Sequence, residues 1–372
     1  MAQTVPRQSN TNLTPWLVTE SEFPKDGNTH DQLQFLLRYA VLAQSYYNTQ
    51  PWEFSIEDSQ INLYTKESRW LKTADPDKRE LYLSVGCALE NLLIAAEHFR
   101  FGHQISRFPE ANNENWVARV IITTISQSTA LRSPALFDAI TKRHTHHHRF
   151  DTRPLQEPHL QTIRKYLTEE DIWLEITDDR NIMDKVAKYA AHANTISFAD
   201  SRFVDEVKQR IGEGVFGKAQ HPSDSDSGQI NTQKTTQKKA QKTTQKTSQQ
   251  ISQKAATQKQ TGQTLVKRVN QQEQEILKSA PSIAVLSSPF DNHMTHVIAG
   301  QIFEKLCLEA ALLGVRCLPL NQLIEVPESR NSVNELFPHL KGKPLVVFAM
   351  GYGEEETQQQ WTPRLTFDQV LH

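Results

Sequence analysis

Two polar segments carry the residue types best suited to hold a small molecule that has both a ring and a charge. Residues 45–52 (SYYNTQPW) place Ser45, Asn48 and Gln50 after an apolar helical pattern and before a strand-like one. Amide side chains both donate and accept hydrogen bonds, as the edge of a heterocyclic ring requires. Pro51 favours an extended backbone at Gln50, so a turn is expected here. A polar turn in front of a core tryptophan is the alternative interpretation.

Residues 143–150 (RHTHHHRF) are the second segment. Arg143 offers forked donors and Thr145 a hydroxyl, which together with the neighbouring basic groups suit a phosphate. The histidines alternate along the segment, so a strand would place three of them on one face, where they could hold a metal. Asp151 is the only carboxylate spaced closely enough to join these histidines as a metal ligand, and no cysteine lies within that spacing. We therefore predict a phosphate site here and no metal site.

Hydrophobic spacing predicts the elements that would position these segments. Thr29 and Gln32 have the spacing of a capping box, and the apolar pattern after them predicts a helix that ends near Tyr46. Two short strands around a turn, a long helix with apolar residues on most sides and a further strand are expected over residues 54–64, 79–99 and 116–125.

The second part of the chain repeats this order. Gly86 and Glu90, four residues apart in the first long helical pattern, are matched by Gly300 and Glu304 in the second. Each pattern is followed by a glycine-containing turn and a strand rich in branched residues, which in the second part covers residues 344–349. Such a repeat indicates two similar halves about a pseudo-two-fold axis, with a functional site between them. Coincidental helix–strand similarity is the alternative.

The formal net charge of −2 is the sum of two unlike parts. Residues 218–272 hold ten Lys and Arg against two Asp and Glu, so this segment carries +8 and the remainder −10. Glutamine recurs every four residues from Gln233 to Gln249 among Lys, Thr, Ser and Ala. This composition buries too little apolar surface to fold alone, which favours a solvated insertion. It could attract nucleic acid, but it lacks aromatic residues to stack on bases, so we expect no nucleic-acid partner.

The cysteines argue against a disulfide-rich protein, and the lengths of the apolar runs argue against a membrane-spanning one. Cys87, Cys307 and Cys317 are an odd number and form no Cys-x-x-Cys pair, which argues against a disulfide framework. Cys87 and Cys307 lie in helical apolar patterns and are expected to be buried and inert. No apolar run approaches the roughly 20 residues of a membrane span, and the first twelve residues show no secretory signal. A cytoplasmic protein is expected.

Several motifs in a fixed order resemble those of one family, the nitroreductase-like flavoproteins, and specifically their Acg-type branch with two fused halves. The pieces that carry the resemblance are residues 44–52 (QSYYNTQPW), 74–81 (ADPDKREL), 143–150 (RHTHHHRF), 351–353 (GYG) and 362–364 (TPR). It covers the chain from about Leu33 to the C-terminus, apart from the insertion.

The resemblance implies an α+β, nitroreductase-like fold in which two similar helix/sheet halves form an intramolecular pseudo-dimer. The expected parts are an N-terminal arm, a first half, and a second half that contains the insertion at 218–272; they cover residues 1–30, 31–140 and 141–372. Because the chain already contains both halves, we expect a monomer.

The resemblance also implies an FMN site between the halves. The candidate cofactor-binding residues are Arg143, Thr145, His147, Ser45, Asn48, Gln50 and Arg364. Arg143, Thr145 and Arg364 would hold the phosphate, and the turn residues the ribityl chain and the ring. Where the family has arginines, this chain has His144, His147 and His148. A histidine beside a dianion should have a pKa above the usual ~6.5, so FMN is expected to bind best at mildly acidic pH.

The function implied is that of an FMN-dependent oxidoreductase, which passes reducing equivalents from NAD(P)H to an electron-poor small molecule such as a nitroaromatic or a quinone, in a ping-pong reaction. The flavin performs the chemistry, so no catalytic side chain is nominated. The alternative is a protein that binds or sequesters FMN with little reductase activity, with residues 218–272 as a lid over the ring.

Overall fold

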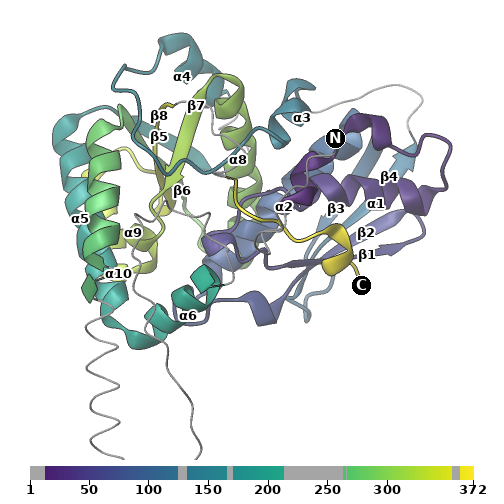
Figure 1. Ribbon diagram of the computed structural model, residues 1–372, viewed down its shortest axis with the longest axis horizontal. Coiled ribbons are helices and arrows are strands. Elements are labelled where there is room, and N and C mark those ends of the chain that lie inside the picture. Colours follow the sequence, from purple (N-terminus) through teal and green to yellow (C-terminus); the bar gives the residue numbers. More distant parts are fainter. Residues whose placement is uncertain (1–12, 125–131, 166–170, 213–262, 265, 354–360) are drawn as a thin grey trace, which may run out of the picture.

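The computed structural model describes residues 13–124, 132–165, 171–212, 263–264, 266–353 and 361–372. Two four-stranded antiparallel sheets lie on either side of the long helices α2 (Arg79–His98) and α8 (His293–Leu312) (Figure 1). Helix α2 packs on the first sheet, α8 packs on the second, and the two helices pack against each other.

The two sheets have the same strand order. The first runs β1-β2-β4-β3 and the second β5-β6-β8-β7, so the second strand is paired with the first and fourth in each. The strands are β1 (Trp52–Glu57), β2 (Gln60–Thr65), β3 (Phe101–Arg107), β4 (Trp116–Thr124), β5 (Trp173–Thr177), β6 (Ser282–Ser288), β7 (Val315–Pro319) and β8 (Lys343–Tyr352). In each half the long helix stands directly before the third strand. The predicted α+β fold of two similar halves is confirmed.

The two long helices cross at the repeated glycines. A Cβ atom added to Gly86 would overlap the carbonyl oxygen of Val297, and one added to Gly300 would overlap that of Leu83. Gly86 and Val297 correspond to Gly300 and Leu83 when the halves are exchanged. Rotation by 180° about the pseudo-two-fold axis therefore maps one of these contacts onto the other. Backbones can approach this closely only where neither helix carries a side chain.

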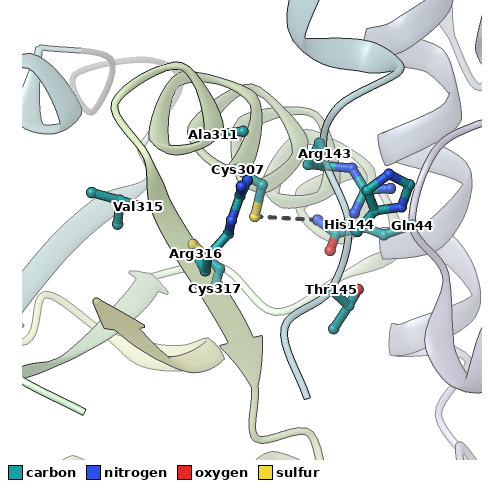
Figure 2. A pocket seen from close by; sticks show the side chains of 9 residues that line it. All are labelled: Gln44, Arg143, His144, Thr145, Cys307, Ala311, Val315, Arg316 and Cys317. Carbon is teal, nitrogen blue, oxygen red and sulfur yellow. Dashed lines mark hydrogen bonds between the residues drawn. The ribbon is translucent and has the colours of Figure 1, made fainter. Parts of the chain in front are cut away.

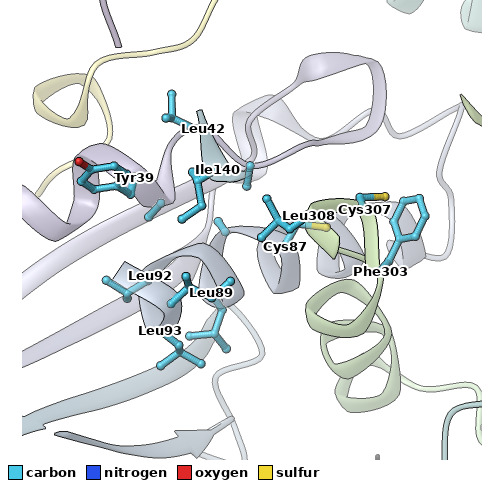
Figure 3. Close-up of a cluster of buried hydrophobic side chains, with 14 of the residues drawn as sticks. Tyr39, Leu42, Cys87, Leu89, Leu92, Leu93, Ile140, Phe303, Cys307 and Leu308 are labelled. Carbon is cyan, nitrogen blue, oxygen red and sulfur yellow. The ribbon is translucent and has the colours of Figure 1, made fainter. Parts of the chain in front are cut away.

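The main hydrophobic core runs through this crossing and joins both halves. Nearly every residue of α2 is buried, which confirms a helix packed on several faces. Figure 3 shows side chains of α2, among them Leu89, Leu92 and Leu93, close to Ile140 and to Leu308 of α8. A second cluster lies within the second half and packs α5 against β6 and β8.

The remaining helices surround this frame. They are α1 (Thr29–Ala40), α3 (Ala135–Ile140), α4 (Glu157–Arg164), α5 (Arg180–Ala199), α6 (Ser201–Gly212), α9 (Gln322–Glu325), α10 (Pro327–Leu336) and a helix over residues 266–279, with short 3-10 turns at Thr14–Leu17, Glu20–Glu22, Tyr46–Asn48, Glu67–Arg69 and Phe367–Gln369.

Helix α1 differs from its prediction at both ends. Its N-cap is Asn28, whose side chain accepts from the backbone N–H of Asp31 at 2.9 Å, so the predicted capping box at Thr29 was wrong by one residue. The helix ends at Ala40 and not near Tyr46. The apolar residues after Ala40 stay buried without continuing the helix, which is why spacing alone extended it.

Both ends of the chain close onto the middle of the molecule. The predicted N-terminal arm is packed only in part: Trp16 and Val18 are buried, whereas residues 19–22 and 25–30 are exposed. The C-terminal segment crosses from the second half to the first (Figure 1), where Phe54 of β1 donates its N–H to the carbonyl of Val370 at 2.7 Å. Residues 213–262, with most of the predicted insertion, lie outside the described residues, and the lid role stays a prediction.

A buried cluster of acids also joins the halves. Nη2 of Arg79, on α2, donates hydrogen bonds to Oε1 of Glu325, on α9, and to Oε1 of Glu80, the latter at 3.0 Å. Asp75 accepts from the backbone N–H of Glu80 at 3.0 Å. Three carboxylates thus surround one guanidinium. Burial and the neighbouring acids raise the pKa of Asp75, and burial, opposed by Arg79, raises that of Glu325 to about 7.

This cluster predicts a stability that falls as pH rises. The folded protein holds a proton on Glu325 that the unfolded chain releases near its ordinary pKa of about 4.3. The stabilisation is therefore complete below that value and is lost as pH rises through about 7. Between pH 4.5 and 8.5 this linkage lowers the free energy of unfolding by about 3 kcal/mol, and Glu325→Gln should remove that decline from values measured by urea unfolding. The matched control Glu328→Gln, whose side chain is 81% exposed, should keep it. An unchanged slope in Glu325→Gln would contradict the assignment.

Candidate functional site

A small pocket opens where residues 143–145 pass between the two halves (Figure 2). About 240 Å³ of space lies within it, part of which is open to solvent. It is lined by Gln44, Arg143, His144, Thr145, Cys307, Ala311, Val315, Arg316 and Cys317. None of these nine residues is acidic and two are arginines, so the pocket suits an anionic group.

Arg143 is held by both halves. Its Nη2 atom donates to the carbonyl oxygen of Leu42, just beyond α1, at 3.1 Å. Its Nε atom lies 3.2 Å from Oε1 of Glu304 on α8. Glu304 is completely buried, and this burial raises its pKa although Arg143 opposes the shift. The guanidinium is thus fixed in place before any ligand arrives.

Arg364 brings a second guanidinium to the same place. Its Nε atom donates to the Leu42 oxygen at 3.4 Å, and its Nη1 atom donates to Oδ1 of Asn48 at 2.8 Å. The residue is only 4% exposed. Burial, together with the charge of Arg143, lowers the pKa of Arg364 to about 9. Two buried guanidinium groups thus share one carbonyl oxygen, an arrangement that an anion would stabilise.

The predicted polar turn has a strained backbone. Tyr47, Asn48 and Gln50 have φ angles of 46°, 53° and 49°. This left-handed conformation costs an L-residue about 1–2 kcal/mol, and such strain concentrates at ligand sites. The C-terminal segment holds the turn, because Asn48 Nδ2 donates to the carbonyl of Pro363 at 2.9 Å and the N–H of Leu365 donates to Gln50 Oε1 at 2.7 Å.

His144 lies between two tryptophan rings. Its ring centroid is 4.4 Å from that of Trp16 and 4.9 Å from that of Trp361. Burial and the charges of three neighbouring arginines lower its pKa to about 2. Aromatic packing and like charge thus favour the neutral ring of His144. The expected raised pKa applies to a histidine beside a bound phosphate dianion, and it stays a prediction.

The structure brings together only part of the predicted set. Arg143 and Thr145 line the pocket, and Arg364 stands beside Arg143. Ser45 accepts the N–H of Gln50 at 2.9 Å and shapes the turn. His147 is exposed and does not line the pocket.

Sequence reasoning missed four side chains of the pocket that carry nitrogen or sulfur. Cys317 and Arg316 come from β7, and Cys307 from α8 accepts from Nε2 of Gln44 at 3.5 Å. The predicted burial of Cys307 is confirmed. The sequence did not predict that Cys307 lines the pocket. Gln44 directly precedes the polar motif and could have been included. No sequence signal marks Arg316, which is one charged residue in a short strand.

The described residues contain neither a metal-binding cluster nor a membrane span. No group of three or more His, Cys, Asp or Glu side chains within them is placed to hold a metal ion. No helix in the described ranges is both long and apolar enough to cross a membrane.

Comparison with known proteins gives relatives that extend along the whole chain. No family model matches. Two proteins of Mycobacterium tuberculosis strain H37Rv, both named "Putative NAD(P)H nitroreductase" and distinguished as Rv3131 and acg, are similar to it. Rv3131 is 22% identical over 360 residues, 94% of either chain. The acg protein is 21% identical over 349 residues, which are 92% of this chain and 96% of that protein.

Solved structures give weaker similarities. The FMN-dependent nitroreductase NfnB from Mycobacterium smegmatis, in complex with NADPH, is 14% identical, covers 63% of this chain and 96% of its own, and has a TM-score of 0.37. A structure described as "a putative nitroreductase from Anabaena variabilis" is 10% identical to this chain and has a TM-score of 0.43. The match covers 95% of this chain and 93% of that one. Because curated relatives that include acg match nine-tenths or more of this chain, its resemblance to the Acg-type nitroreductase-like proteins is confirmed.

Proposed function

We propose that this protein is an FMN-dependent oxidoreductase that takes reducing equivalents from NAD(P)H and passes them to an electron-poor small molecule, such as a nitroaromatic or a quinone, in a ping-pong reaction. The observation that carries the proposal is the pair of buried guanidinium groups, Arg143 and Arg364, beside a pocket between the halves. The names of the curated relatives support NAD(P)H as the donor.

The residues present fit the phosphate end of FMN. Arg143 and Arg364 would pair with the phosphate oxygens, and the hydroxyl of Thr145 would add a hydrogen bond. The polar turn with Asn48 and Gln50 would face the ribityl chain and the ring. When bound, the flavin supplies the hydride and electron chemistry, and the protein orients it and limits access to it.

A protein that sequesters FMN is the second candidate, and the packing of the chain ends favours it. Trp16 donates its Nε1–H to the carbonyl of Thr362 at 2.8 Å and lies 4.8 Å from the guanidinium carbon of Arg364. The arm and the C-terminal segment thus close together over the arginines. This cover would slow release of FMN, and if it also shielded the ring it would exclude NAD(P)H.

One spectroscopic experiment separates these functions. Oxidised flavin absorbs near about 370 and 450 nm. Purified protein loaded with FMN should show both bands, and NADPH or NADH added without oxygen should bleach the 450 nm band if the protein is a reductase. Bands that persist would favour sequestration. A protein that is colourless and takes up no added FMN would contradict both functions.

The neutral His144 predicts how FMN affinity depends on pH. The second proton of a phosphate monoester leaves near pH 6, whereas His144 stays uncharged down to about pH 2. Affinity should therefore rise from pH 5 to 7, as the phosphate becomes a dianion, and stay flat to pH 8.5. Quenching of flavin fluorescence measures it. Affinity that falls between pH 6 and 8.5 would instead support the original expectation of a protonated histidine at the phosphate.

A further inference from the structure

Arg316 is a pocket residue whose Nε atom has no hydrogen-bond partner among the described residues. It lies on β7 and lines the same pocket as Arg143 (Figure 2). Its Nε atom is shielded from solvent and makes no hydrogen bond, and no ion pair links it to an acid within the described residues. A shielded polar atom without a partner costs free energy, so such atoms commonly mark the position of a missing ligand.

The position of the Arg316 side chain is set by a glycine. A Cβ atom added to Gly353 would lie 2.9 Å from Cγ of Arg316 and 2.9 Å from Cε1 of His146. Because residue 353 has no side chain, the stem of Arg316 can lie against the backbone at this point. The guanidinium then faces the pocket from the strand side, across from Arg143 and His144 (Figure 2).

The charges around the pocket do not balance. Arg143, Arg364 and Arg316 contribute three positive charges, and the charges of all three act on His144, which stays neutral. Glu304 is the acid ion-paired with Arg143. Among the described side chains named here, three guanidinium groups thus stand against one carboxylate, an excess of two positive charges. This excess is the complement of a phosphate monoester at neutral pH, with its charge of about −1.5 to −2. A phosphodiester carries only one negative charge.

We propose that Arg316 is the third guanidinium of a site for a terminal phosphate dianion. Arg143 lines the pocket, Arg364 donates to the same Leu42 carbonyl oxygen as Arg143, and Arg316 adds a third guanidinium from β7. The identity of the ligand as FMN rests on the function proposed above. The geometry itself specifies a phosphate monoester.

The test compares FMN with riboflavin, which has the same ring but no phosphate. In Arg316→Gln the dissociation constant for FMN should rise about ten- to a hundredfold, the effect of losing one charge-assisted hydrogen bond. The constant for riboflavin should not change. Arg164→Gln is the matched control, because it removes one exposed charge from α4 in the same half without touching the pocket. FMN binding within twofold of wild type, or an equal loss for riboflavin, would overturn the proposal.

A second measurement makes the test independent of flavin. Inorganic phosphate, added against sodium chloride of equal ionic strength, should raise the Tm of the wild-type chain and of Arg164→Gln but not of Arg316→Gln. Without phosphate, Arg316→Gln should melt at or above the wild-type temperature, because it relieves repulsion among the three arginines. If the wild type bound no flavin but showed this phosphate response, the proposed function would fail and the phosphate site would stand. No response of the wild type would overturn the site.

Discussion

Gly300→Ala is expected to destabilise the protein by about 3 kcal/mol or more, or to prevent folding. The added methyl group would overlap the carbonyl oxygen of Leu83, a backbone atom that no rotamer change can remove. Relief requires α2 and α8 to separate along a contact buried on both sides. That separation would open the core that joins the halves. Urea-unfolding free energies, or the soluble yield where the variant does not fold, measure the effect.

Two further variants test the reason for this effect. Gly314→Ala introduces the same methyl group at a φ of +70° with no atom within 4 Å, so it should cost only about 1 kcal/mol of backbone strain. Gly86→Ala should resemble Gly300→Ala, because the two sites correspond across the pseudo-two-fold axis. The double variant should cost less than the sum of the two, since one separation of the helices relieves both overlaps. A Gly300→Ala protein as stable as Gly314→Ala would refute close backbone contact at the crossing.

The sequence predicts those parts of the fold that local residue patterns determine. Gly86 and Glu90 recur at Gly300 and Glu304, and this repeat indicated the two halves. Their shared strand order then follows from duplication. The end of α1 was not predictable in the same way, because the buried residues after Ala40 keep helical spacing while tertiary contacts set their conformation.

The site was predictable where a motif marks it. Arg143, Thr145 and Arg364 were nominated from the resemblance, and the structure brings them to one place. Arg316 was missed because its contribution depends on the strand edge beside Gly353, which no spacing reveals. The lowered pKa of His144 could not be predicted, because the sequence does not show that Trp16, 128 residues away, packs on its ring.

Arg143→Ala is expected to lower both stability and FMN affinity, for two separate reasons. The ion pair with Glu304 is lost, and Glu304, with no exposed surface, is left without its guanidinium. Breaking a buried pair in this way costs about 3–5 kcal/mol. The phosphate loses its most firmly held guanidinium at the same time, so FMN affinity should fall at least about a hundredfold, as when two charge-assisted hydrogen bonds are removed.

Glu304→Gln, alone and combined with Arg143→Ala, separates the two effects. The double variant no longer buries an unpaired carboxylate, so its unfolding free energy should recover most of the loss caused by Arg143→Ala. Its FMN affinity should stay as low as that of Arg143→Ala, because the guanidinium is still absent. Glu304→Gln alone should bind FMN as tightly as wild type or more tightly, since it removes the negative charge that is ion-paired with Arg143. If the double variant regained FMN binding along with its stability, Arg143 would be a structural residue and the phosphate would have to lie elsewhere.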